Sequence, residues 1–198
     1  TWALRSGGSG NDLASAIELL DDGSWVIAGS FSTTMRVGTN TLTSAGSTDA
    51  FYASGTQAGA FSSSQGFGGT LADAATSVDS STTQIFVGGS FQDAANLGDA
   101  IRVSAGSSDV FVVAIARSTS VVEWSATGGG TGADVLYGVV SGPDGYPVLA
   151  GSFSGAATFG STALTSVGGL DAFLARATSG ATFSGASRSG GASDDVVR

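Results

Sequence analysis

Three residue types that carry much of protein chemistry are missing from this 198-residue chain, which has no cysteine, no histidine and no lysine. Without cysteine there is no disulfide and no thiolate, so stability must come from packing, and the redox compartment cannot be deduced from cysteine pairing. Without histidine and cysteine the usual nucleophile–base catalysis is excluded, and without lysine Schiff-base catalysis is excluded. A carboxylate pair of the glycosidase kind is the acid–base chemistry that remains.

Positive charge is scarce as well. The seven cationic residues are all arginines, against sixteen acidic residues, and the net charge is −9 at pH 7. Nucleic acids and anionic membranes bind clustered cationic side chains, and no such cluster occurs, so the composition excludes both as partners. The longest apolar run, Val110 to Ala116, is far short of the roughly 20 residues that span a bilayer, so membrane insertion is excluded too.

Glycine, by contrast, is abundant, and it recurs at fixed intervals. The segment AGSF at Ala28–Phe31 returns at Gly88–Phe91 and Ala150–Phe153, which are 60 and then 62 residues further on. The pair Gly7-Gly8 returns at residues 68, 129 and 190, in three steps of 61. Such periods are typical of repeat proteins, whose units bury their apolar surface by stacking. We therefore predict one repeat domain over residues 1–198, with units at about 1–60, 61–121 and 122–183 and a partial fourth at 184–198.

Each unit has the pattern of four short strands. In the first unit, Asp21-Asp22-Gly23 separates the β-compatible runs Ala14–Leu20 and Trp25–Phe31, and an Asp-Gly between two apolar runs predicts a tight hairpin. The third unit repeats this pattern at Pro143-Asp144-Gly145, whereas the second has no glycine at this point and should have a different loop. No segment shows a capped 3.6-residue apolar period, so the predicted fold class is all-β.

Two runs, Val110–Ile115 and Val135–Val140, are apolar almost without interruption. Strands of this kind belong to sheets that are covered on both faces. Four-stranded blades packed between neighbouring blades meet this condition, so we predict a β-propeller-like architecture of about three four-stranded blades plus the start of a fourth. A closed three-unit fold resembling a β-trefoil is the alternative. If each unit forms one four-stranded sheet, Phe31, Phe91 and Phe153 should be buried at equivalent places on an inner strand.

The repeat resembles the SBBP-type bacterial β-propeller repeat. The third unit carries the resemblance best, with Trp124, the run Gly129–Asp134, Ala150–Ser154, Phe159-Gly160 and Asp171-Ala172-Phe173. The second unit departs from the pattern, because a serine-rich stretch near Phe61 replaces the tryptophan. The resemblance implies a propeller in a secreted or cell-surface protein, and it implies no shared catalytic residues.

An aspartate follows each glycine pair, and Gly129–Leu136 fits the nonapeptide of calcium-binding parallel β-rolls. That kind of calcium site needs nonapeptides in tandem, whereas these copies lie 61 residues apart. We therefore expect these aspartates to accept backbone N–H groups in the glycine turn, with no metal and no cofactor. The four residues are Asp12, Asp73, Asp134 and Asp195.

Other candidate site residues are acids and aromatics. The two glutamates, Glu18 and Glu123, lie in or beside predicted strands, and Asp21–Trp25 only faintly matches the sialidase Asp-box. No catalytic residue is assigned, and the ligand-binding residues remain open. Aromatic side chains could stack on sugars, but we expect them to fill the space between blades, above all Trp2 and Trp124, which hold equivalent positions. The other aromatics considered are Trp25, Tyr52, Tyr137 and Tyr146.

These observations favour a non-enzymatic, extracellular structural or adhesion module that meets a protein or glycan partner at a surface. A carbohydrate-binding propeller is the alternative, and a carboxylate-dependent glycosidase is a third possibility. Three blades cannot complete a ring of the usual four to eight, and segment 188–198 has the pattern of another first strand. We therefore expect the chain to belong to a longer polypeptide or to an assembly.

Overall fold

The computed structural model describes residues 1–196, and these are all-β, with no α-helix. This confirms the predicted fold class. The strands, in chain order, are β1 (Gly7–Gly8), β2 (Asp12–Leu19), β3 (Trp25–Phe31), β4 (Thr34–Val37), β5 (Asn40–Thr43), β6 (Asp49–Gly55), β7 (Phe61–Gly69), β8 (Ala74–Ser80), β9 (Gln84–Phe91), β10 (Ala94–Asn96), β11 (Ile101–Val103), β12 (Asp109–Ala116), β13 (Val122–Gly130), β14 (Val135–Ser141), β15 (Pro147–Phe159), β16 (Thr162–Thr178) and β17 (Thr182–Ser189).

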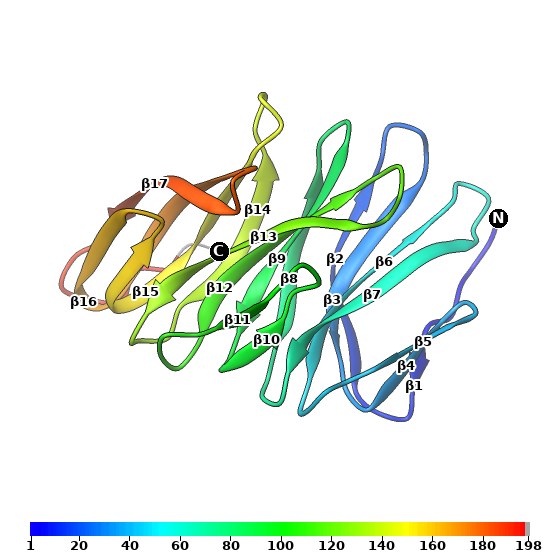
Figure 1. The fold of residues 1–198 in the computed structure, drawn as a ribbon, viewed down its shortest axis with the longest axis horizontal. Coiled ribbons are helices and arrows are strands. Elements are labelled where there is room, and N and C mark those ends of the chain that lie inside the picture. Colours follow the sequence, from blue (N-terminus) through cyan, green and yellow to red (C-terminus); the bar gives the residue numbers. More distant parts are fainter. Residues whose placement is uncertain (197–198) are drawn as a thin grey trace.

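Twelve of these strands form three four-stranded antiparallel ladders of one design. Ladder I has the order β2-β3-β6-β7, ladder II β8-β9-β12-β13, and ladder III β14-β15-β16-β17. The three ladders follow one another along the long axis of the molecule (Figure 1). The first hairpin of ladders I and III turns at the predicted glycines, Gly23 and Gly145, which have φ of 78° and 82°. In ladder II the turn closes through Ser81 and Gln84 instead, so the predicted difference in the second unit is confirmed.

The ladders are out of phase with the repeat units that the sequence suggested. The fourth strand of ladder I is β7, which belongs to the second unit, and the fourth strand of ladder II is β13, which belongs to the third. Our expectation of one four-stranded sheet per unit is therefore wrong by one strand. The glycine pair marks the end of a ladder, because it closes the fourth strand, and the next ladder begins after it.

A short hairpin from each ladder reaches back to this glycine pair. Strand β10 pairs with Gly68 and Gly69 at the end of ladder I, and the second half of β15 pairs with Gly129 and Gly130 at the end of ladder II. At the first of these glycine pairs, β4 pairs in the same way with β1. The approach is so close that a Cβ atom on Gly130 would lie 1.7 Å from the Ala156 carbonyl oxygen. Glycine is required here because only a hydrogen fits.

Most of the apolar core lies between the ladders. One cluster joins side chains of ladders I and II, among them Tyr52, Phe67 and Val87, and a second joins ladders II and III. A third, smaller cluster packs Phe31, Phe51 and Ala53 of ladder I against Met35 and Val37 of β4. Phe31, Phe91 and Phe153 are fully buried on the second strand of their ladders, which confirms their predicted equivalence.

Only one of the two predicted two-faced strands is covered on both faces. Every residue of β12 is buried, as predicted. In β14, however, Tyr137 and Val140 are exposed. The prediction is wrong for these two residues because no further ladder covers that side of ladder III.

The three ladders do not close on themselves. Ladders I and III share no strand pairing and lie at opposite ends of the long axis (Figure 1), so the closed three-unit alternative is wrong for the described residues. The expectation for segment 188–198 also needs correction. Residues up to Ser189 finish β17, the fourth strand of ladder III, and residues 190–196 contain no strand. The residues after 196 lie outside the described part of the chain.

Candidate functional site

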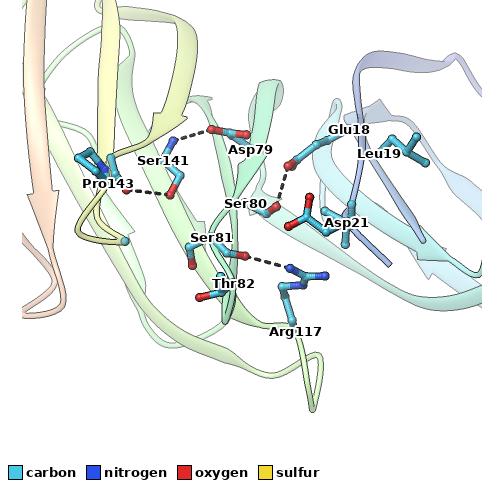
Figure 2. Close-up of a pocket in the computed structure, with 13 residues that line it drawn as sticks. Glu18, Leu19, Asp21, Asp79, Ser80, Ser81, Thr82, Arg117, Ser141 and Pro143 are labelled. Atoms are coloured by element: carbon cyan, nitrogen blue, oxygen red, sulfur yellow. Dashed lines mark hydrogen bonds between the residues drawn. The ribbon is translucent and has the colours of Figure 1, made fainter. Parts of the chain in front are cut away.

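A polar cleft lies where the first strands of the three ladders end. It has a volume of about 350 Å³, and its walls come from β2, β8 and β14 and from the loops that follow them (Figure 2). Carboxylates, hydroxyls and one guanidinium line it. The labelled lining residues are Glu18, Leu19, Asp21, Asp79, Ser80, Ser81, Thr82, Arg117, Ser141 and Pro143.

Two carboxylates in this cleft link neighbouring ladders. Glu18 of ladder I accepts a hydrogen bond from the Ser80 hydroxyl of ladder II at 2.6 Å, and Asp79 of ladder II accepts one from the Ser141 backbone N–H of ladder III at 2.5 Å (Figure 2). Glu18 and Asp79 hold equivalent places, since they pair with Val26 and Phe86 on the next strand. Ladders II and III therefore each donate a hydrogen bond to an acid of the preceding ladder.

Arg117 supplies the positive charge of the cleft. Its guanidinium donates to the Ser81 carbonyl oxygen at 3.1 Å and lies 3.6 Å from the Asp22 carboxylate. These contacts fix the side chain between the first-hairpin loops of ladders I and II. No sequence signal marked Arg117, because it lies in a loop that differs from unit to unit. Ser80 and Ser141 could have been found from their shared spacing of 62 residues from an acid.

Burial raises the pKa of Glu18 above its usual value, and the nearby Asp79 carboxylate adds to this rise. The Ser80 hydroxyl opposes it by donating to the charged form. The second oxygen of Glu18, Oε2, is buried and has no hydrogen-bond partner. The cleft thus holds one carboxyl group that is partly desolvated and faces another acid.

A second cleft, of about 550 Å³, adjoins the first and shares Leu20, Thr82 and Arg117 with it. Its lining is rich in hydroxyl groups from both ladders I and II. These hydroxyls belong to Ser24, Ser54, Ser62, Thr82, Thr83, Ser118 and Ser120. Together the two clefts offer many hydrogen-bond donors and acceptors and no aromatic platform.

The candidate acids from the sequence are not brought together as a pair. Glu18 lines the cleft, whereas Glu123 lies outside its lining and accepts a hydrogen bond from the Gln84 side chain. In the Asp-box-like segment, Asp22 accepts the N–H and the hydroxyl of Ser24, which makes a local turn. This contact lowers the pKa of Asp22. The acid that lies near Glu18 is Asp79, which sequence reasoning did not single out.

The aspartates after the glycine pairs behave as predicted. In all four, Oδ2 accepts the backbone N–H of the second glycine at 2.7 Å. Two of these four aspartates have another repeated aspartate beside them. At Asp134 the neighbour is Asp109, since a Cβ atom on Gly129 would lie 2.6 Å from Asp134 and 2.7 Å from Asp109. Burial and the Asp109 charge raise the pKa of Asp134 to about 6. Among residues 1–196 no three histidine, cysteine or acidic side chains are grouped so as to hold a metal ion.

The aromatic residues divide into core and surface. Trp124 and Tyr52 are buried between ladders, as expected. Trp25 is buried too, but on the side of ladder I that no other ladder covers, where it contacts Trp2 and Phe61. Trp2 is half-exposed, so the core prediction is wrong for it. It lies on Trp25 with ring centroids 6.0 Å apart, and the described residues include no ladder before it that would cover it. Tyr137 is partly exposed, and Tyr146 is near the Ser179 hydroxyl.

Comparison with protein-family models and with curated proteins finds no match. The described part of the chain has no helix with the length and apolar character needed to cross a membrane. The resemblance to the SBBP-type repeat therefore stays a prediction, and function must be argued from the clefts and from the ladder interfaces.

Proposed function

We propose that this chain is a non-enzymatic structural module of the β-propeller type, whose ladders are three consecutive blades, and that it serves in adhesion outside the cell. The antiparallel order of each ladder and the apolar clusters between ladders support the propeller. The extracellular setting rests on the SBBP resemblance.

The use of the cleft carboxylates supports a structural role over a catalytic one. Glu18 and Asp79, the two acids at equivalent places, each bond to the next ladder. The aspartates of the glycine turns bond to backbone N–H groups in the same repeated manner. An acid that recurs at both junctions and accepts a hydrogen bond from the next ladder serves the fold, whereas catalysis needs residues peculiar to one site.

The hydroxyl-lined clefts favour carbohydrate binding as a second candidate function. Sugars are recognised through their hydroxyl groups, and the joined clefts present serine and threonine hydroxyls together with the Arg117 guanidinium. If the chain binds carbohydrate, its adhesion partner is a glycan. If it is a structural module without carbohydrate binding, its adhesion partner is a protein.

Two measurements test the proposal. Incubation with aryl glycosides should give no hydrolysis above buffer, and turnover that Glu18→Gln abolishes would contradict the non-enzymatic role. For the second candidate, binding to a panel of immobilised glycans should fall in Thr82→Val, which removes an exposed hydroxyl shared by both clefts. Thr41→Val, on exposed β5 and outside both clefts, is the matched control. Absence of binding to every glycan would leave the protein-adhesion role as the proposal.

A further inference from the structure

The two ends of the row of ladders carry apolar side chains that no ladder covers. The head face of ladder I presents Ile17, Leu19 and Ile27 beside a groove of about 330 Å³ that also contains Trp25 and Phe61. The tail face of ladder III presents Val140, Val148 and Leu174. Monomeric proteins rarely leave such faces open, so exposed apolar faces indicate an interaction surface.

The internal interfaces show what covers each face. Ile17 pairs with Ile27 in the same way as Val78 pairs with Val87 and Val139 with Leu149. Val78 and Val139 are only 8% and 3% exposed, since they pack on the preceding ladder, whereas Ile17 is 73% exposed. The head face of ladder I therefore has the composition of an interface, and no ladder covers it in the described residues.

The tail face shows the same contrast. Leu174 pairs with Ala150, as Tyr52 pairs with Ala28 and Val112 with Gly88. Tyr52 and Val112 are 0% exposed because the next ladder covers them, and Leu174 is 51% exposed. By this equivalence, a ladder that packed on the tail face would place its counterparts of Ile17 and Ile27 over Leu174.

A paired substitution identifies the ladder that fits the tail face. At both internal junctions an acid on one ladder accepts a hydrogen bond from a serine of the next, Glu18 from the Ser80 hydroxyl and Asp79 from the Ser141 backbone N–H. The tail face has Val140 in place of the acid, and the head face has Leu19 in place of the serine. The acid of both junctions and the serine hydroxyl of the Glu18–Ser80 junction are thus replaced by apolar side chains. The two faces match each other, and neither matches the polar side of an internal junction.

We propose that the tail face of one copy of this chain packs on the head face of a second copy, with the geometry of the two internal interfaces. The inference rests on the ladder stacking of the proposed propeller. A contact between different faces can close into a ring. Two copies that closed on each other would have six ladders, from three in each, within the usual range of four to eight blades.

The amino-terminal segment competes for this contact. In the described structure, Gly7 and Gly8 pair with β4 just as Gly129 and Gly130 pair with β15. The corresponding pair at the end of ladder III, Gly190-Gly191, has no hairpin partner in residues 1–196. In the proposed pair of chains, Gly190-Gly191 of one copy would take the β4 hairpin of the other, and residues 1–8 would be displaced.

The first test separates the two faces by sedimentation of the whole chain. Ile17→Asp on the head and Leu174→Asp on the tail should each weaken self-association at least about tenfold. Both residues are exposed in the single chain, so the fold should survive. An equimolar mixture of the two variants should associate again, because it retains one unaltered head and one unaltered tail. Ile101→Asp, an exposed position on β11, should behave as the wild type.

Three results would overturn the proposal: a wild-type chain that stays monomeric up to its solubility limit, a Leu174→Asp variant that still associates alone, or a mixture of the two variants that does not associate.

A second set of variants probes Val140 on the tail face and Leu19 on the head face. Val140→Asp should weaken association at least about tenfold, and Val140→Asp with Leu19→Ser should recover most of the loss. Trp2→Ala should loosen residues 1–8 and thereby strengthen the association of two chains. Weaker association of this variant would contradict the displacement of residues 1–8. Ile17 and Leu174 lie outside the polar clefts, so the results for the Ile17→Asp and Leu174→Asp variants do not depend on the glycan test.

Discussion

At the scale of single residues, the most unusual feature is the pair of buried carboxylates beside Gly129. Asp109 and Asp134 are both buried, and one oxygen of each, Oδ1, has no hydrogen-bond partner. Their other oxygens accept the backbone N–H groups of Ala105 and Gly130. These N–H groups offset part of the desolvation cost of two neighbouring acids, and the free oxygens show that the rest of the cost is not offset.

The pair predicts a pH-dependent stability. The pKa of Asp134 is raised from 3.8 to about 6 in the folded chain, so between these values the folded state holds a proton that the unfolded state has lost. The free energy of unfolding should therefore fall as pH rises through this window, by at most about 3 kcal/mol for this group. Urea unfolding of wild type and Asp134→Asn at about pH 4 and about pH 7 measures it.

In the Asp134→Asn variant the amide oxygen can still accept from Gly130, and the amide N–H can donate to Asp109. We expect this variant to be at least as stable as the wild type at neutral pH and to have a shallower pH dependence. A variant that keeps the full wild-type dependence would show that other acids cause it.

The buried phenylalanine of the second strand gives another residue-scale prediction. Phe91 is fully buried and contacts Phe111 edge to face, with ring centroids 6.4 Å apart. Replacement by alanine leaves a cavity between ladders I and II that the neighbouring side chains cannot readily fill. Phe91→Ala should therefore lower the free energy of unfolding by about 3–5 kcal/mol. Thermal and urea unfolding measure the change. A loss below about 1 kcal/mol would mean that the core collapses into the space.

At the scale of elements, the sequence predicted the strands better than their grouping. Trp25–Phe31 is found as β3 with the predicted bounds, because an Asp-Gly turn and an apolar run define it locally. The assignment of β7 and β13 to the preceding ladder was missed, since a repeat period has no intrinsic starting point. The cleft was missed as well. Its residues come from three ladders, and only the stacking of the ladders brings Glu18 to Ser80.

The glycine that ends each fourth strand predicts a sharp contrast between two substitutions. Gly129 has φ of 150°, and a Cβ atom there would lie within 2.7 Å of both buried carboxylates. Gly129→Ala should therefore destabilise the chain by about 2 kcal/mol or more, through backbone strain and overpacking. Gly138 on β14 has open space around it, so Gly138→Ala is the control and should be nearly neutral. Equal losses in the two variants would contradict this account.

At the scale of the whole molecule, the row of ladders has a middle and two ends. Ladder II is covered on both sides, whereas ladders I and III each have one open apolar face. In stacked repeats each unit is stabilised mainly by its neighbours. The acid–serine links add polar bonds at both junctions without joining the ends.

This arrangement predicts an ordered loss of structure. Amide hydrogen exchange under native conditions should be slowest in β12, whose residues are all buried, and faster in β2, where most residues are exposed on one side. Strands at an open end can separate without breaking the central core, so their opening costs less free energy than global unfolding. The measurement is best made on Ile17→Asp, in which the proposed pairing of chains cannot protect the ends. Equal protection in β2 and β12 would mean that the three ladders unfold as one cooperative unit, and the description of the molecule as a row of separately stabilised ladders would then be wrong.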